Sequence, residues 1–330
     1  MRLKNVPQHI YIYLMGFMGL ISLFVTSGCL TGCSYHTDSD TSGDEKPIVT
    51  VSLAPYASLV SDIAGDRMRV STLMPKGGDP ETYDPTVKDI RRLNGSTLYL
   101  MAGNMPFEQR MASQLPANVK TVDLSEGIDL LYGTHSHGNA HSHLHEHQHG
   151  LSHSHEAGEI IDHEHHHDES ADPHTWSSLR NGKIIVANIV KALSETDPDG
   201  AGYYTSRGAR LTQRIDSLDA MYTAAFAAQN GCTFLIWHPS LSYLAHDYGL
   251  HQHSLLQENK EHSVKSLKAT LDSASAISPK VLLLQPESDI PIARSTASSF
   301  GVPVETINPL NPDWMGEMIH TLDALTSSVK

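Results

Sequence analysis

Short apolar runs and longer amphipathic segments alternate along the first half of the chain. Residues 47–55 (PIVTVSLAP) and 68–75 (MRVSTLMP) are β-branched, apolar runs that each end at a proline. Such runs predict buried strands, and residues 96–104 and 118–125 repeat the pattern. Between the first two runs, residues 56–65 carry apolar side chains at helical spacing and end at a glycine. This alternation predicts a parallel sheet with helices on its faces.

Residues 84–95 (DPTVKDIRRLNG) predict a short amphipathic helix. Asp84 is placed to cap its start, and Pro85 suits a first helical turn. The segment ends at Gly95, a common position for a helix stop. Three apolar residues are expected to share one face of this helix, namely Val87, Ile90 and Leu93.

The second half of the chain repeats the strand and helix alternation after a long helical region. Residues 179–195 predict an amphipathic helix, and residues 197–229, which begin with an Asp–Pro pair that is predicted to cap the helix, predict one long helix. Three strand-like runs follow at 232–240, 280–287 and 302–309, separated by helical segments. The predicted fold class is therefore α/β, with one α/β lobe, a loop, a long helix and a second α/β lobe.

The N-terminus has the pattern of an export signal. Arg2 and Lys4 precede an apolar run at 10–25, and small residues then lead to a cysteine. The run has about 16 residues, against the roughly 20 that a spanning helix needs. An uncleaved membrane anchor is the alternative interpretation.

LTGC, at residues 30–33, resembles the bacterial lipobox, in which the signal is cleaved before a cysteine that is then lipidated. Residues 1–33 are accordingly predicted to be a lipoprotein signal with Cys33 as the lipidated residue, and residues 34–46 a polar tether. A competing match ends at Cys29. The mature protein is expected to be exported and held at a membrane by its lipid, in the periplasm or on the cell surface.

Composition narrows the class of partner. The chain has 330 residues, 39% of them apolar, which suits two domains with real cores. Its formal net charge of −14 disfavours nucleic acid as a partner, because nucleic acid is bound by basic surfaces. Cys232 has no mature partner except the candidate lipid site, so neither a structural disulfide nor a thiolate zinc cage is expected.

Residues 133–170 form an insertion rich in histidine and poor in apolar residues, predicted to be a disordered or metal-ordered loop. Many of its histidines are two residues apart, so pairs of them can chelate one ion in an extended chain. Binding of this kind orders the segment each time, which predicts several weak sites rather than one tight site. The proposed secondary metal-binding residues are His135, His137, His141, His143, His145, His147, His149, His153, His155, His163, His165, His166 and His167.

Other metal-capable side chains follow predicted strands. Open parallel sheets bind ligands beyond the carboxyl ends of their strands. The candidates at such positions, together with the histidine between the insertion and the next helix, are Glu81, Asp84, His174, His238, Gln285 and Glu287. Each alone is also compatible with a helix cap or a solvated loop residue.

Four ordered motifs carry a family resemblance. They are PETYDPTVKDIRRL, DPHTW, WHPSLSYLAHDYGL, and LLLQPE followed by GVPVETINPL. They resemble the zinc- and manganese-binding solute-binding proteins of bacterial ABC importers, from about Ile48 to the C-terminus. The resemblance implies two α/β lobes bridged by one long rigid helix, with the metal in the cleft between the lobes. The expected bounds are 47–196, 197–229 and 230–330.

The resemblance also implies a ligand set. His174 and His238 match the family's metal-binding positions, while Glu81 stands where the first motif commonly has histidine. The acidic ligand of some members falls at Asn308, so we infer Glu287 as a fourth ligand; water or a histidine of the insertion are the alternatives. Asp172 and Pro173 are expected to orient His174, and two aromatic residues to wall the cleft, namely Tyr83 and Trp176.

The expected cargo is Zn²⁺, with Mn²⁺ or Fe²⁺ as the alternative, because a mixed nitrogen and carboxylate set admits all three metals. The expected function is metal delivery to an ABC permease and its ATPase by a monomer that catalyses no reaction. Three other functions compete: a manganese or iron importer component, a surface metal-storage or adhesion protein, and a zinc hydrolase. Two HExxH strings, at 145–149 and 163–167, lack the apolar-faced helix that a metalloprotease needs.

Overall fold

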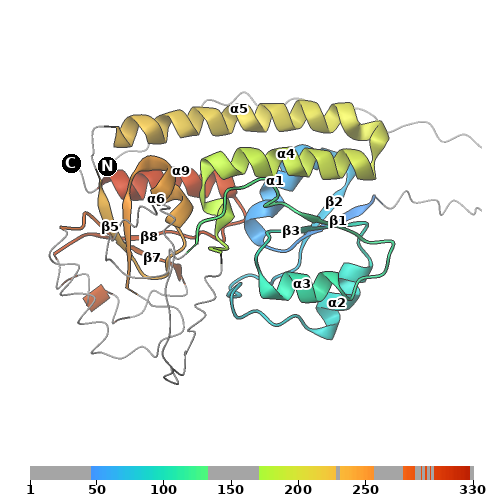
Figure 1. Cartoon of the computed structure of the whole chain (residues 1–330), viewed down its shortest axis with the longest axis horizontal. Helices are drawn as coiled ribbons and strands as arrows, with labels where there is room; N and C mark the ends of the chain where they lie inside the picture. Colours follow the sequence, from blue (N-terminus) through green and yellow to red (C-terminus); the bar gives the residue numbers. More distant parts are fainter. Residues whose placement is uncertain are drawn as a thin grey trace, which may run out of the picture. The chain divides into compact units, whose positions relative to one another are not determined.

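The computed structural model describes residues 46–132, 171–227, 231–255, 278–286 and 301–327, and four more residues between 291 and 298. The predicted signal and the insertion 133–170 lie outside the described residues, as does the tether apart from Lys46. Two parallel sheets of four strands organise the described part (Figure 1).

The first sheet is built from the four strand runs that the sequence predicts in the first half of the chain. Its strand order is β2-β1-β3-β4, and all neighbouring strands are parallel. Apart from Ile48 at the start of β1, the apolar side chains of β1 and β3 are buried, as expected for central strands covered on both faces. The strand bounds are β1 Ile48–Val51, β2 Arg69–Thr72, β3 Leu98–Met101 and β4 Lys120–Asp123.

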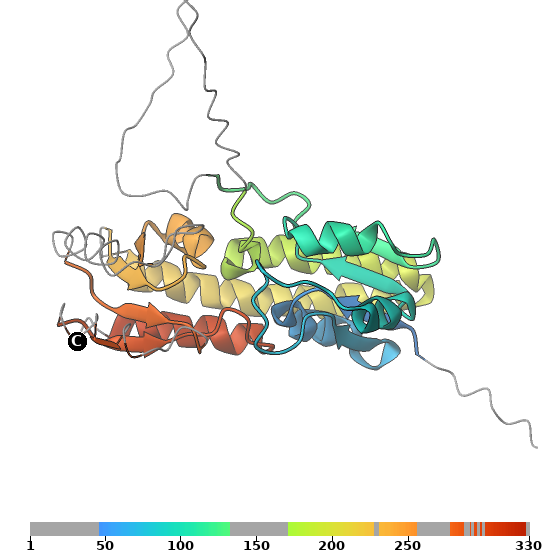
Figure 2. The same ribbon diagram turned by 90° about the horizontal axis from the view of Figure 1, so that it is seen from below.

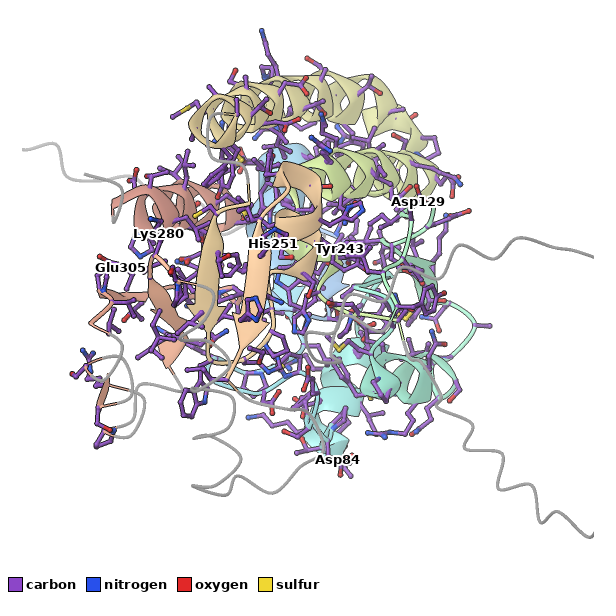
Figure 3. The ribbon with its side chains drawn as sticks, turned by 60° about the vertical axis from the view of Figure 1, so that its left-hand side comes forward. Asp84, Asp129, Tyr243, His251, Lys280 and Glu305 are labelled. Atoms are coloured by element: carbon purple, nitrogen blue, oxygen red, sulfur yellow. The ribbon has the colours of Figure 1, made fainter. Side chains whose placement is uncertain are left out.

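The second sheet has the order β6-β5-β7-β8, again with parallel neighbours. Three of its strands match predicted runs, namely β5 Thr233–Ile236, β7 Leu282–Leu284 and β8 Val304–Thr306. The edge strand β6, His251–Ser254, was missed because its sequence HQHS has no apolar position to mark it. His251 opens this strand and is labelled in Figure 3. Sheet pairing with β5 therefore overrides a polar sequence here.

Helices cover both sheets (Figures 1 and 2). The longest, α5, spans Ala201–Phe226 and follows a short 3₁₀ turn at Pro198–Gly200, within the predicted 197–229. The other helices and turns whose bounds the described residues give are α1 Ala54–Ala64, η1 Gly65–Arg67, α2 Val87–Asn94, α3 Pro106–Ala112, η2 Thr175–Ser177, α4 Leu179–Thr196, α6 Ser242–Tyr248 and α9 Trp314–Ser327. None of the helices in the described part combines the length and apolar content that a membrane crossing requires.

Helix α5 connects the two lobes. Its 26 residues give a rod of about 39 Å. It packs along α4 and against α1 on the side of the first sheet, and against α6 and α9 on the side of the second. Close packing on α4 requires Gly208, because a Cβ there would lie 2.4 Å from Val190 Cγ2. The fold is thus two parallel-sheet α/β lobes joined by a long inter-lobe helix.

The start of α2 differs from the prediction. The N-cap is Thr86, not Asp84: the Thr86 side chain accepts from Asp89 N, and the Asp89 carboxylate accepts from Thr86 N. This capping box satisfies two backbone donors, whereas Asp84 precedes a proline, which disfavours helical backbone at that residue. Asp84 is highly exposed and pairs with Arg110. The helix ends at Gly95 as predicted, although Val87 is 65% exposed rather than part of a buried face.

The Asp–Pro that precedes α5 also has a different role from the predicted cap. The Asp197 carboxylate accepts hydrogen bonds from Arg67 Nε at 2.7 Å and Nη2 at 2.9 Å, and from Tyr204 OH at 2.5 Å. The hydrogen bond from Arg67 is the main cause that lowers the pKa of Asp197 to about 2. Asp197 therefore ties the turn between α4 and α5 to the first lobe.

Candidate metal centre

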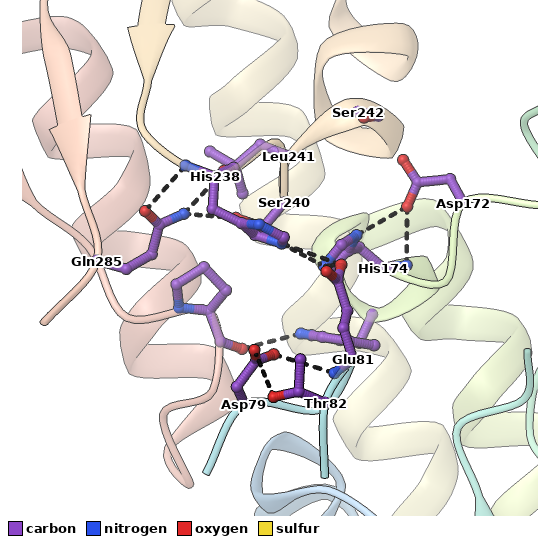
Figure 4. Close-up of polar contacts among 12 residues, drawn as sticks. Asp79, Glu81, Thr82, Asp172, His174, His238, Ser240, Leu241, Ser242 and Gln285 are labelled. Carbon is purple, nitrogen blue, oxygen red and sulfur yellow. Dashed lines mark hydrogen bonds and ion pairs between the residues drawn. The ribbon is translucent and has the colours of Figure 1, made fainter. Parts of the chain in front are cut away.

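Glu81, His174 and His238 lie together, although they come from three separate segments of the chain (Figure 4). Glu81 lies in the loop between β2 and α2, His174 directly precedes the turn η2, and His238 follows β5. The two histidine Nε2 atoms are 3.1 Å apart, and Glu81 Oε1 is 3.3 Å from His238 Nε2 and 3.8 Å from His174 Nε2. We call these three residues the three-ligand cluster.

These distances fit one small metal ion. Zinc bonds of about 2.0–2.1 Å in a tetrahedron place the ligand atoms roughly 3.4 Å apart. The three observed separations, 3.1, 3.3 and 3.8 Å, bracket that value. A single ion can therefore take all three atoms as ligands with shifts of a few tenths of an ångström, and a fourth tetrahedral position lies outside this trio.

His174 is oriented from behind by a buried carboxylate. Asp172 Oδ1 accepts from both the backbone N and the ring Nδ1 of His174, each at 2.9 Å. Burial raises the pKa of the Asp172 carboxyl, but hydrogen bonds from His174 and its charge outweigh burial, and the pKa lies well below its ordinary value. Because the ionised carboxylate can only accept, Nδ1 carries a proton, and in the neutral imidazole the Nε2 lone pair faces His238 and Glu81.

His238 is held through its backbone by Gln285 (Figure 4). The Gln285 amide donates to His238 O at 2.9 Å and to Ser240 Oγ at 3.0 Å, and its oxygen accepts from His238 N at 3.4 Å. Gln285 is 1% exposed and directly follows β7. It therefore holds His238 from the end of the strand that neighbours β5. Gln285, a candidate ligand by its position, is a support for a ligand instead.

The hydrogen bonds that hold the backbone of Glu81 join residues close together in the sequence. Asp79 accepts from Glu81 N at 3.0 Å and from Thr82 Oγ1 at 2.9 Å, which forms a turn within four residues. The Glu81 side chain is 29% exposed, against 3% for His174. Tyr83, two residues on, packs edge-on against Phe107, with ring centroids 5.1 Å apart. This contact attaches the Glu81 loop to α3.

A buried tryptophan packs beside His174, and a second one binds the first. The Trp176 ring lies 5.3 Å from the His174 ring and donates from Nε1 to Pro309 O at 2.9 Å. Trp314, in α9, donates from Nε1 to Trp176 O at 2.7 Å. Trp176 thus packs beside the His174 ring, and the two tryptophans link the DPHTW segment to the second lobe. That Tyr83 and Trp176 wall a cleft stays a prediction.

The other predicted site residues fall into two groups. Asp84 is not in the three-ligand cluster, and the Asn308 amide oxygen accepts from Leu310 N while its backbone N donates to Glu317. Glu287, Cys33 and the thirteen histidines of the insertion lie outside the described residues. The support that Gln285 gives to His238 was missed, because nothing in an uncharged polar residue after a strand marks it as the partner of a ligand 47 residues away.

Comparison with known proteins places this geometry in a family. The model of ZnuA, the periplasmic zinc-uptake complex component A, matches residues 49–328. The chain belongs to the ZnuA family. The high-affinity zinc uptake system protein ZnuA of Bacillus subtilis is 27% identical over 301 residues, 87% of this chain and 88% of that protein.

Other relatives and solved structures agree with the assignment. The zinc-binding protein AdcA of Streptococcus pyogenes serotype M3 is 26% identical over 270 residues, 79% of this chain and 50% of that protein. The chain thus spans about half the length of the AdcA relatives it matches. A crystal structure of ZnuA, 26% identical, superposes with a TM-score of 0.71 over 86% of this chain and 100% of that one. A "138-173 ZnuA deletion mutant plus zinc bound", also 26% identical, gives 0.69 over 86% and 98%.

Proposed function

We propose that this ZnuA-family chain captures Zn²⁺ with Glu81, His174 and His238 and delivers it to an ABC permease and its ATPase. The observation that carries the proposal is the three-ligand cluster, whose separations match one tetrahedral ion. The zinc-related names of the relatives support zinc as the cargo. The protein is proposed to catalyse no reaction, since the family comprises uptake components.

The donor set supports zinc without excluding its competitors. Two imidazole nitrogens with one carboxylate oxygen also suit Mn²⁺ or Fe²⁺, but intrinsic affinity at such sites is higher for Zn²⁺ than for Mn²⁺. The fourth ligand is proposed to be Glu287, water or a histidine of the insertion. Competition between Zn²⁺ and Mn²⁺ for the chain tests the cargo, and a preference for Mn²⁺ would overturn the zinc assignment.

The insertion 133–170 is proposed to collect metal rather than to form the transport site. Its neighbours Tyr132 and Ala171 pair in an antiparallel bridge, so a short turn can replace the whole insertion without moving the described residues. We expect a chain lacking 133–170 to keep one tight zinc site, whereas a storage or adhesion protein of the surface would lose nearly all metal. Isothermal titration of both chains separates the two functions.

A double variant then locates the tight site. His174→Ala/His238→Ala in the shortened chain removes two of the three ligands and should abolish tight binding. The matched control is His246→Ala/His251→Ala, which removes two exposed histidines outside the three-ligand cluster. Equal binding by both double variants would contradict the proposed site.

The remaining proposals concern location and assembly. We propose that the signal is cleaved directly before Cys33, that Cys33 carries the lipid that holds the protein at the membrane, and that the protein is a monomer. The family description, a periplasmic component, supports export. The intact mass of the mature N-terminal peptide distinguishes lipidation at Cys33 from lipidation at Cys29, and sedimentation gives the oligomeric state.

A further inference from the structure

The residues on either side of the histidine-rich insertion form a closed stem. Tyr132 pairs with Ala171 in an antiparallel bridge, and Asp172 N donates to Leu131 O at 2.8 Å. We call Leu131, Tyr132, Ala171 and Asp172 the stem. Asp172, its last residue, is also the carboxylate that orients His174. The point where the insertion leaves the first lobe therefore adjoins the three-ligand cluster.

One hydroxyl from the second lobe joins both sides of the stem. Tyr243, in α6 and labelled in Figure 3, donates from its OH to Asp172 O at 2.8 Å. The same oxygen accepts from Leu131 N at 3.3 Å. With the bond from Asp172 N to Leu131 O, these contacts make a ring of three hydrogen bonds. Burial raises the pKa of Tyr243 to about 12, so its hydroxyl keeps its proton at neutral pH.

Hydrogen bonds hold Asp172 at both of its backbone groups and at its side chain. Its backbone N is bound to Leu131, its backbone O to Tyr243, and its carboxylate to the His174 ring. Asp172 is fully buried, so these bonds are shielded from water. A carboxylate held at both backbone groups can hold an imidazole in one orientation, which is what a preformed metal site requires.

We propose that Tyr243 is a positioning residue for the metal site: through the stem and Asp172, its hydroxyl sets the direction of the His174 ring. The inference rests on the proposed metal binding at the three-ligand cluster. It makes the affinity of the cluster depend on the closure of the stem, and so couples the insertion to the transport site through described residues.

The test compares two variants of the full chain, Tyr243→Phe and Tyr248→Phe. Both residues lie in α6, and each substitution removes one hydroxyl that donates a hydrogen bond. In the control, the hydroxyl of Tyr248 donates to Asp219 Oδ1 at 2.8 Å. Zinc affinity of the tightest site is measured by chelator competition. We expect Tyr243→Phe to weaken it about 10-fold, in the range of changes to groups behind a ligand, and Tyr248→Phe to change it less than about 2-fold.

A second readout separates positioning from loss of stability. The His174 Nδ1–H proton bound to Asp172 is assigned in the nuclear magnetic resonance spectrum by its absence in His174→Ala, and its exchange with water is then followed. Faster exchange in Tyr243→Phe but not in Tyr248→Phe is the expected result. Equal affinity and equal exchange in the two variants would overturn the inference. Absence of any tight site that depends on His174 would instead overturn the proposed function.

Discussion

The histidines and the glutamate of the three-ligand cluster are supported in different ways. His174 is backed by the buried Asp172, whose backbone is bound to the distant Leu131 and Tyr243. His238 is backed by the buried Gln285, which lies 47 residues away. Glu81 lies on a loop whose hydrogen bonds to Asp79 span two and three residues, and its side chain is ten times as exposed as that of His174.

The difference suggests a division of work within the site. A preformed arrangement lowers the ordering cost of capture, because Asp172 already holds the His174 ring and Gln285 already holds the His238 backbone. A ligand on an exposed, locally folded loop can withdraw at lower cost than one fixed by a buried network. A carrier that must bind tightly and then release benefits from both kinds of ligand, and the following substitutions test this comparison.

The largest effect is expected for the fixed ligand itself. His174→Ala should weaken zinc binding more than the ~10–100-fold typical of changes behind a ligand, because it removes a metal ligand itself. Glu81→Ala should weaken binding less, since both oriented imidazoles remain. Titration of zinc into the chain lacking 133–170 measures both, and a greater loss for Glu81→Ala would reverse the comparison.

The next effect concerns the proton on His174. Asp172→Asn places an amide beside Nδ1, and if the amide NH₂ faces the ring, the proton moves to Nε2, the metal-binding atom. We expect affinity to fall about 10–100-fold. The control is Asp247→Asn, a partly buried carboxylate of α6, which accepts a hydrogen bond from Ser178 Oγ. Loss of affinity of the same size in the control would point to a general effect of charge.

A smaller effect is expected behind His238. Gln285→Leu removes the amide that holds the His238 backbone, which should weaken zinc binding about 10-fold or less and cost about 1–3 kcal/mol of unfolding free energy. Gln252→Leu is the matched control, because Gln252 also binds a backbone N and a serine hydroxyl, at Leu241 and Ser242. Calorimetry should show similar destabilisation in both variants, with the loss of affinity confined to Gln285→Leu.

Much of the fold and the candidate ligands of the site could be predicted from the sequence, whereas the residues that support these ligands could not. Apolar runs located seven strands, because central strands of parallel sheets are buried on both faces. The polar edge strand β6 gave no such signal, and the start of α2 depended on a capping box at Thr86 that competed with Asp84. Position at strand ends and motif resemblance together brought out Glu81, His174 and His238.

What the sequence could not supply was the set of partners behind the ligands. Gln285 was a candidate by position, but only its distances to the His238 backbone distinguish a support from a ligand. Tyr243 lies 71 residues from Asp172, and no local pattern joins them. Glu287 as fourth ligand stays a prediction.

The tryptophans have an optical consequence. The chain has three, and all are buried beside the three-ligand cluster or its supports: Trp176 against His174, Trp237 directly before His238, and Trp314 hydrogen-bonded to Trp176. Indole emission depends on nearby charge, and a divalent ion held by the two histidines adds charge next to these rings. The protein therefore carries its own fluorescent reporter, and unlabelled chain should show filling and emptying of the site in real time.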